Sequence, residues 1–245
     1  MRAALLVAAI TLAAAPAAAQ GLSPLDLLGG GADDGALAQR SIQILLLITV
    51  LSIVPGLAVT ITCFPFVVTV LSILRQALGM QQSPPNMLIV SLALFLSWFV
   101  MEPVMTAAWD NGVEPYVAQE ITLEDAVPRM IAPFRGFMAA RTAPDTLQVL
   151  ADLRPGFDAG TDARDAPLSL LVPSFLLSEL SRAFQVGFLV FLPFLVIDLV
   201  VAAVLMSMGM MMVPPAIVSL PFKLAFFVVA DGWSLIAASL VRGYG

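Results

Sequence analysis

The chain contains no histidine and a single cysteine, Cys63, among its 245 residues. One cysteine excludes a disulfide within the chain, and the absence of histidine removes the commonest ligand of zinc and haem. The sequence also has no His-Glu-x-x-His motif, no phosphate-binding glycine loop and no nucleophile with a recognisable base. We therefore predict a protein that is not an enzyme and that has no metal ion and no cofactor.

Charged residues are scarce as well, at 11% of the chain, whereas 60% of the residues are hydrophobic and the mean hydropathy is +0.99. Soluble domains carry roughly 25% charged residues. The net charge of -6 lies mostly in one segment, and no basic stripe is present that could hold the phosphates of a nucleic acid. The composition predicts a polytopic, all-α membrane protein that contacts lipid and no nucleic acid.

The first 19 residues have the pattern of a secretory signal peptide. Arg2 supplies the positive start, residues 3–15 a short apolar core, and residues 17–19 a small-residue cleavage site before Gln20. The core is too short to span a bilayer, although an uncleaved anchor is the alternative. Cleavage would leave the mature N-terminus in the periplasm. Residues 20–40 begin glycine-rich and polar and are predicted to be a flexible lead.

Two similar glycine–proline segments divide the rest of the chain. Residues 209–215 read GMMMVPP and residues 79–85 read GMQQSPP, with the same spacing. Glycine ends a helix readily because it tolerates positive φ, and a proline pair cannot continue that helix but suits the start of the next. Each segment is therefore predicted to be the hinge of a helical hairpin. The hinge residues are Gly79, Pro84, Pro85, Gly209, Pro214 and Pro215.

The two predicted hairpins, residues 41–109 and 168–245, contain about four transmembrane-type helices. Residues 41–74 carry no charge and exceed the roughly 20 residues of one crossing, and Pro55 and Pro65 predict a kinked or two-piece helix. Residues 87–108 return outward; residues 184–208 lead inward and residues 214–241 outward again. The segment between the hairpins, 110–167, is rich in acids, arginines and prolines. It is predicted to be a small helical periplasmic domain, with helix starts at Thr122 and Thr142.

Four charged residues interrupt the apolar segments. Asp198 and Asp231 are predicted intramembrane charges, and Glu179 and Lys223 are candidates for an ion pair, within one chain or between copies. A charge inside a membrane costs roughly 2.5–3.5 kcal/mol on insertion scales, so each of them needs a partner or water. Two interpretations stay open. The charges fix the register of a helical assembly, or they form a proton relay. The lack of histidine argues against the relay.

A run of methionines, Met210, Met211 and Met212, occupies the second hinge. Methionine is unbranched and polarizable, so it packs against many shapes. One interpretation is a loop that faces the membrane or a partner protein. The other is a deformable ring that closes a conduit and still yields to diverse passengers.

Several motifs together resemble the FliP family of flagellar biosynthetic proteins and their injectisome counterparts. The resemblance covers about residues 42–240. Its motifs are SEL (178–180), AFQVGF (183–188), FLPFLVIDLV (191–200), MGMMMVPP (208–215), LPFK (220–223) and DGW (231–233), with LRQALG (74–79), PPN (84–86) and LALFL (92–96) earlier. One departure is Pro65-Phe66, which stands where the family usually has Thr-Arg.

The resemblance implies a core subunit of the type III export gate, in the bacterial inner membrane at the flagellar basal body. It implies a homo-oligomeric ring, generally a pentamer, that is joined by FliQ-like and FliR-like proteins and passes unfolded flagellar substrates. In this family Met210–Met212 would form the gasket, Glu179 and Lys223 would help to join subunits, and the ring would be lifted partly out of the bilayer. The resemblance does not decide between flagellar and injectisome use.

A small-solute secondary transporter subunit is the alternative function. Internal repeats and intramembrane charges are typical of transporters. The shared orientation of the two hairpins and the small number of crossings argue against it.

Overall fold

The computed structural model describes residues 34–80, 84–154, 162–210 and 212–244. Every regular element in these ranges is a helix, which confirms the predicted all-α fold class. The predicted signal peptide and residues 20–33 of the predicted lead lie outside them. The chain divides into two compact units, Met1–Val54 and Pro55–Gly245.

Helix α2 (Asp34–Thr60) begins inside the segment that was predicted to be a flexible lead. Residues 34–40 include Ala, Leu, Gln and Arg, which favour a helix. The helix continues through Pro55 and ends at Thr60, and α3 (Phe64–Ala77) begins after Cys63 with Pro65 in its first turn. The predicted two-piece helix is therefore confirmed, but the break lies at residues 61–63 and not at Pro55.

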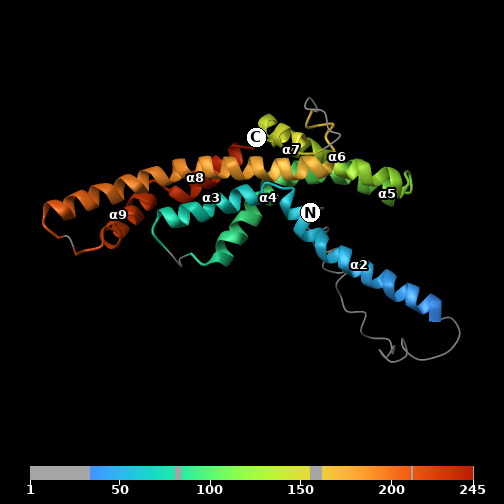
Figure 1. Cartoon of the computed structure of the whole chain (residues 1–245), viewed down its shortest axis with the longest axis horizontal. Helices are drawn as coiled ribbons and strands as arrows, with labels where there is room; N and C mark the ends of the chain where they lie inside the picture. Colours follow the sequence, from blue (N-terminus) through green and yellow to red (C-terminus); the bar gives the residue numbers. More distant parts are fainter. Residues whose placement is uncertain (1–33, 81–83, 155–161, 211, 245) are drawn as a thin grey trace. The chain divides into compact units, whose positions relative to one another are not determined.

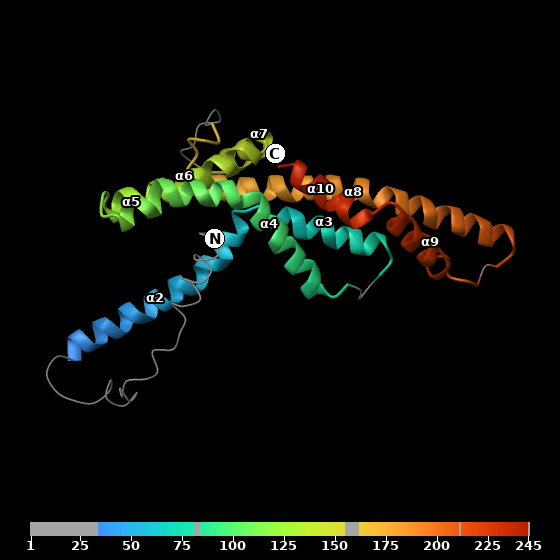
Figure 2. The same ribbon diagram turned by 180° about the vertical axis from the view of Figure 1, so that it is seen from behind.

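The second unit is built along α8 (Leu168–Ser207), a helix of 40 residues. At 1.5 Å per residue it is about 60 Å long, roughly twice the thickness of the hydrocarbon core of a bilayer. Pro173 and Pro193 lie inside this helix without ending it. Figures 1 and 2 show α3 beside the middle of α8 and α9 (Pro215–Val229) returning along its C-terminal part.

The polar segment is helical, and its helices α6 and α7 pack against α8. Helix α4 (Asn86–Ala108) continues into a π-helix, η1 (Trp109–Val113), and then α5 (Glu114–Val117), before α6 (Leu123–Arg141) and α7 (Pro144–Asp152). The Thr122 hydroxyl accepts a hydrogen bond from the Asp125 N–H at the start of α6, and α7 starts two residues after Thr142. Both predicted helix starts are confirmed.

The last apolar segment, residues 214–241, which was predicted to be one crossing, is bent. Helix α9 ends at Val229, α10 (Gly232–Arg242) follows, and the two axes differ by 63°. The break contains Asp231, a non-glycine residue with a φ of 47°, and then Gly232. Among the described residues, three helices are long and apolar enough to cross a membrane, or four if the bent pair is one span. This agrees with the prediction of about four.

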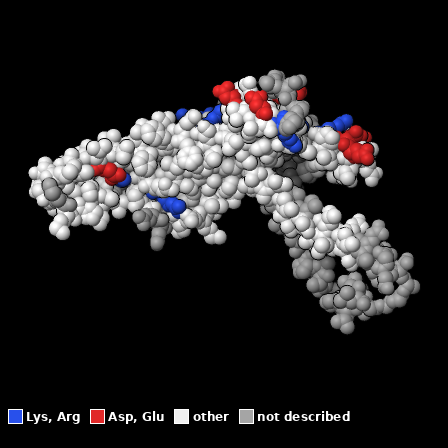
Figure 3. Space-filling model, in the orientation of Figure 1, with Lys and Arg blue, Asp and Glu red and all other residues white. Residues whose placement is uncertain are grey.

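Charged side chains are unevenly distributed over the second unit. On the face shown in Figure 3 they gather at the end that contains α5, α6 and α7, and few of them lie at the end formed by α9 and the C-terminal part of α8. This distribution follows the division between the polar segment 110–167 and the apolar segments.

Two buried apolar clusters hold the second unit together. The larger is centred on α3 and includes Cys63, Val67, Leu71 and Leu74, with residues of α4, α8, α9 and α10 around them. The smaller joins α6 and α7 to the start of α8 through Met138, Leu147 and Phe175. Cys63 is fully buried.

Gly187 allows α3 and α8 to approach closely, and replacing it should separate them. A Cβ atom there would lie 3.2 and 3.3 Å from Cγ2 and Cβ of Ile73, and closer still to its Cδ1. Gly136 on α6 is the matched control, because a Cβ there would meet nothing within 4 Å. Both Gly→Ala changes add roughly 0.5–1 kcal/mol of helix propensity. Overpacking costs about 1–3 kcal/mol at Gly187 alone. Equilibrium unfolding in detergent should therefore rank Gly187→Ala below wild type and Gly136→Ala at or above it. Equal stabilities of the two variants would contradict this packing.

Candidate functional site

Two clusters of charged and polar groups lie in the apolar second unit. One surrounds the carboxylate of Glu179 and the other surrounds the ammonium group of Lys223. Both acids of these clusters, Glu179 and Asp198, come from α8.

The Glu179 side chain is fully buried and has three partners. Its Oε1 lies 3.6 Å from Nε of Arg141 and 3.8 Å from Nη1 of Arg182, and its Oε2 accepts a hydrogen bond from the Tyr244 hydroxyl. The separation from Arg141 is too long for a hydrogen bond, and neither Arg141 Nε nor Glu179 Oε1 has another hydrogen-bond partner in the described chain. Charge attraction holds this pair.

Tyr244 joins the cluster to the surrounding helices. The Arg141 guanidinium lies 3.8 Å above the Tyr244 ring, in cation–π geometry, and Arg141 Nη1 donates to the Gly243 carbonyl at 2.8 Å. The ring stacks on Phe137 and meets the edge of Phe66. Burial, followed by the neighbouring Glu179 carboxylate, raises the pKa of Tyr244 well above its usual range. The phenol therefore stays protonated at any physiological pH and remains a donor to Glu179.

The Lys223 cluster ties three helices together. Lys223 Nζ donates to Asp198 Oδ2 at 2.6 Å and to the Ala77 carbonyl at 3.0 Å, and the Ser219 hydroxyl donates to Asp198 Oδ1 at 2.5 Å. Ala77 is the last residue of α3, where carbonyls lack partners within the helix and the helix dipole favours a cation. Lys223 thus closes the end of α3 and connects it to α8 and α9.

Glu179 and Lys223 do not pair with each other in the described chain, since each has the other partners named above. This corrects the within-chain form of the predicted pair; a contact between copies stays a prediction. The sequence contained one signal for the pair that is observed: Asp198 and Lys223 lie at similar distances on either side of the turn at 209–215, so a hairpin brings them together. Arg141 and Tyr244 were missed, because no local pattern links residues so far apart in sequence.

Asp231 lies outside both clusters. It precedes α10, its side chain is exposed, and its Oδ1 accepts a hydrogen bond from the Ser234 hydroxyl at 3.1 Å. Within the described residues it has no ion pair. Its role as an intramembrane charge stays a prediction.

The two predicted hinges adopt matching conformations at their glycines. Gly79 and Gly209 both have a φ of 76°, and the helices after them begin at Asn86 and Pro215, next to the proline pairs. In the second hinge Met212 is 97% exposed and Met210 is 42% exposed, whereas Met211 lies outside the described residues. A single chain thus exposes the side chains of at least two methionines, Met210 and Met212, directly after the positive-φ Gly209.

The first hinge is tied to its flanking helices. Arg75 Nη1 donates to the Asn86 side-chain oxygen and to the Pro84 carbonyl. No group of three or more Cys, Asp or Glu side chains in the described chain is placed to hold a metal ion.

Comparisons with known proteins give one consistent result. The family model described as "FliP family" matches residues 47–240. The flagellar biosynthetic protein FliP of Caulobacter vibrioides is 47% identical over 239 residues, which cover 97% of this chain and 88% of that protein. The FliP proteins of Rhizobium meliloti and Bacillus subtilis are 45% and 43% identical, over 90% and 83% of this chain and 90% and 92% of their own lengths.

Removing the Tyr244 hydroxyl should destabilise the Glu179 cluster. Tyr244→Phe keeps the ring contacts but removes a hydrogen bond to a buried carboxylate, which is worth about 1.5–3 kcal/mol. The chain has two tyrosines, and the exposed Tyr116 provides Tyr116→Phe as the control. Chemical unfolding in detergent should show the loss for Tyr244→Phe alone. The same stability for both variants would contradict the arrangement.

Asp198 and Lys223 should be strongly coupled in a double-mutant cycle. Lys223→Met leaves Asp198 without its cation, and Asp198→Asn leaves a buried ammonium without its carboxylate; each should cost about 1.5–3 kcal/mol. The double variant should cost less than the sum of the two, because it leaves neither charge unpaired. Unfolding free energies that simply add would show that the two groups do not interact.

Proposed function

The chain belongs to the FliP family, and on that premise we propose that it is a non-enzymatic core subunit of the flagellar type III protein export gate. Copies of it form a ring-shaped conduit, a pentamer, which assembles with FliQ-like and FliR-like proteins and passes unfolded flagellar substrates. The flagellar names of its relatives favour a flagellar system over an injectisome.

The observation that carries this proposal is the methionine turn. Met210, Met211 and Met212 follow a left-handed glycine, and the Met212 side chain is almost wholly exposed. A flexible apolar side chain in that position contributes nothing to the packing of its own subunit. Around a shared axis, several copies would give a thioether collar that closes on itself and adapts to a passing polypeptide.

Exposed apolar side chains on α8 support an assembly of several chains. Phe184, Phe188, Leu199 and Val204 are all more than half exposed. Apolar surfaces of this kind mark contacts with other proteins or with lipid. Since α8 is longer than a bilayer is thick, part of this surface is suited to neighbouring subunits outside the membrane.

Glu179 and Lys223 contribute to joining subunits in this proposal. The Glu179 carboxylate is fully covered by its own chain, so it acts by holding α6 against α8 and thereby shaping the surface that neighbours meet. Lys223 holds α9 against α8 and α3 in the same way. The protein lies in the inner membrane, with its mature N-terminus and residues 110–167 in the periplasm.

Replacing Met210, Met211 and Met212 together by alanine should make the gate leak without preventing its assembly. The triple variant, co-expressed with the FliQ-like and FliR-like proteins, should still give the ring in native mass spectrometry. Its ion conductance in planar bilayers should rise severalfold over wild type, because smaller side chains leave the passage open. Met87→Ala, at an 80% exposed position after the first hinge, should leave conductance unchanged.

Three outcomes would contradict the proposal. Unchanged conductance of the triple variant would exclude the gasket. A stable monomer under co-expression would exclude the ring. Solute uptake by liposomes that contain this chain alone would favour the transporter instead.

A further inference from the structure

Four charged residues of the second unit lie outside the polar segment and have no ion pair within the described chain. They are two bases and two acids: Arg75, Arg242, Glu102 and Asp231. A charge on an otherwise apolar surface is unfavourable unless a partner or water compensates it. Opposite charges on two chains that meet in one interface compensate each other.

The Arg75 side chain points away from α8 and has unused hydrogen-bond donors. Ile73 lies against Gly187 of α8, and two positions along a helix turn a side chain by about 200°. On the far side, Arg75 Nη1 donates to the Asn86 side-chain oxygen and to the Pro84 carbonyl. The other two guanidinium nitrogens make no hydrogen bond in the described chain and are not buried. They can therefore donate to a group outside the chain.

Asp231 is an exposed acid in an apolar surrounding. It lies in the break between α9 and α10, and its Oδ1 accepts a hydrogen bond from the Ser234 hydroxyl. Its Oδ2 accepts no hydrogen bond in the described chain. Val228, Val229 and Trp233, its neighbours in sequence, are 74%, 88% and 41% exposed. This patch fits an apolar partner surface that carries one base.

Arg75 lies level with about residue 190 of α8. Helices α3 and α8 run in the same direction (Figures 1 and 2), and the contact between Ile73 and Gly187 puts those two residues at one level. Arg75 follows Ile73 by two residues, which is about 3 Å further along α8.

Asp231 lies at nearly the same level. Helices α9 and α10 run back along α8, with Lys223 bonded to Asp198 at one end and Tyr244 bonded to Glu179 at the other. Asp231 falls between these two bonds, and its position in the sequence also places it level with about residue 190 of α8. The two opposite charges thus share a level but lie on different sides of the unit.

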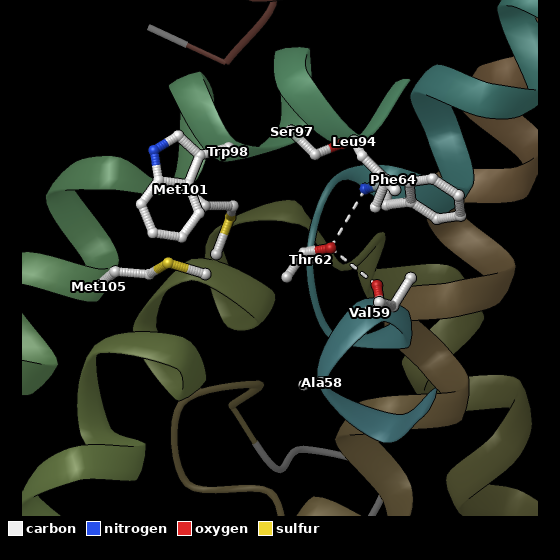
Figure 4. Close-up of a pocket in the computed structure, with 9 residues that line it drawn as sticks. All are labelled: Ala58, Val59, Thr62, Phe64, Leu94, Ser97, Trp98, Met101 and Met105. Atoms are coloured by element: carbon white, nitrogen blue, oxygen red, sulfur yellow. Dashed lines mark hydrogen bonds between the residues drawn. The ribbon is translucent and has the colours of Figure 1, made fainter. Parts of the chain in front are cut away.

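Glu102 and Arg242 lie nearer the start of α3. Glu102 follows Met101, which lines a small apolar cavity together with Phe64, the first residue of α3 (Figure 4). Arg242 is two residues before Tyr244, whose ring meets the first turn of α3. Neither charge therefore shares a level with Arg75 and Asp231.

We propose that Arg75 of one copy forms an ion pair with Asp231 of the next copy around the ring. The inference rests on the proposed ring and names one contact within it. Rotation about a single axis keeps every group at its height along that axis. If α8 lies along the axis, groups at one level meet. Met87, beside Asn86, and the valines beside Asp231 are exposed and apolar, so they shield the pair from water and strengthen it.

A phospholipid fits this pair of sites less well than a second copy does. A phosphate group would compensate Arg75, but it has the same sign of charge as Asp231 and would leave that acid unpaired. A neighbouring copy satisfies both residues with one contact, repeated around the ring.

Exchanging the two charges is the first test. Arg75→Glu and Asp231→Arg, each co-expressed with the FliQ-like and FliR-like proteins, should lower the ring fraction in native mass spectrometry at least fivefold. Each change places like charges opposite each other. The double variant should recover the ring to within twofold of wild type, although the bonds from Arg75 to the first hinge stay lost. Arg242→Glu is the control and should assemble like wild type.

Two results of the exchange would overturn the pair. Both single variants would assemble like wild type, or Asp231→Arg, at its exposed position, would assemble poorly with no recovery in the double variant. Loss of the ring with Arg75→Glu but not with Asp231→Arg would indicate a lipid or another anion at Arg75 and would also overturn it. A wild-type chain that forms no ring would instead contradict the proposed function.

Cross-linking tests the contact without relying on charge. In the variant with Arg75→Cys and Asp231→Cys, a short bis-maleimide should join neighbouring copies into a ladder on a denaturing gel. Cys63 can stay, because it is fully buried. Arg242→Cys with Asp231→Cys is the control and should give no ladder, since its two thiols lie at different levels. No ladder in an assembled ring, or equal ladders from both variants, would overturn the pair and leave the ring itself untouched.

Discussion

The buried carboxylate of Glu179 is the constraint on which the second unit depends. A charge in an apolar interior is tolerated only with partners that offset the loss of water. Here the partners are Arg141 at the end of α6 and Tyr244 beyond α10. One acid on α8 thus holds both the polar segment, through Arg141, and the C-terminal end of the chain, through Tyr244, against α8. Because Asp198, further along α8, holds Lys223 of α9, the two acids of the longest helix position α6, α9 and the C-terminal residues.

The turns and helix starts could be predicted from the sequence because they depend on neighbouring residues. Gly79 and Gly209 have positive φ because glycine has no Cβ to clash, and the prolines after them cannot continue the incoming helix. Thr122 caps α6 through a bond to a residue only three positions away. Such interactions are the same in any fold that contains the segment, so sequence patterns indicate them directly.

The pairings of the charges and the shape of the apolar segments depend on distant residues and were predicted less well. Tyr244 contacts a carboxylate 65 positions earlier in the chain, and no period or motif connects them. Pro173 and Pro193 leave α8 intact, as apolar helices packed on neighbours tolerate proline, whereas the last segment bends at Asp231, whose left-handed backbone is rare for a residue with a side chain. Phe66, part of the Pro65-Phe66 departure from the family pattern, packs against the Tyr244 ring, so the site has an aromatic contact at that position.

The two hinges share a backbone turn but differ in their surroundings, and this difference bears on function. A Cβ atom at Gly79 would meet the Leu220 side chain at 3.7 Å, the Lys223 ammonium lies nearby, and Arg75 bonds across the turn to Asn86. A Cβ atom at Gly209 would meet nothing within 4 Å. The first turn is therefore part of the packed unit, whereas the second extends away from it with exposed methionines. Two copies of one motif that differ in this way can have different roles. The first turn holds its own helices together, and the second is available for contacts outside its own chain.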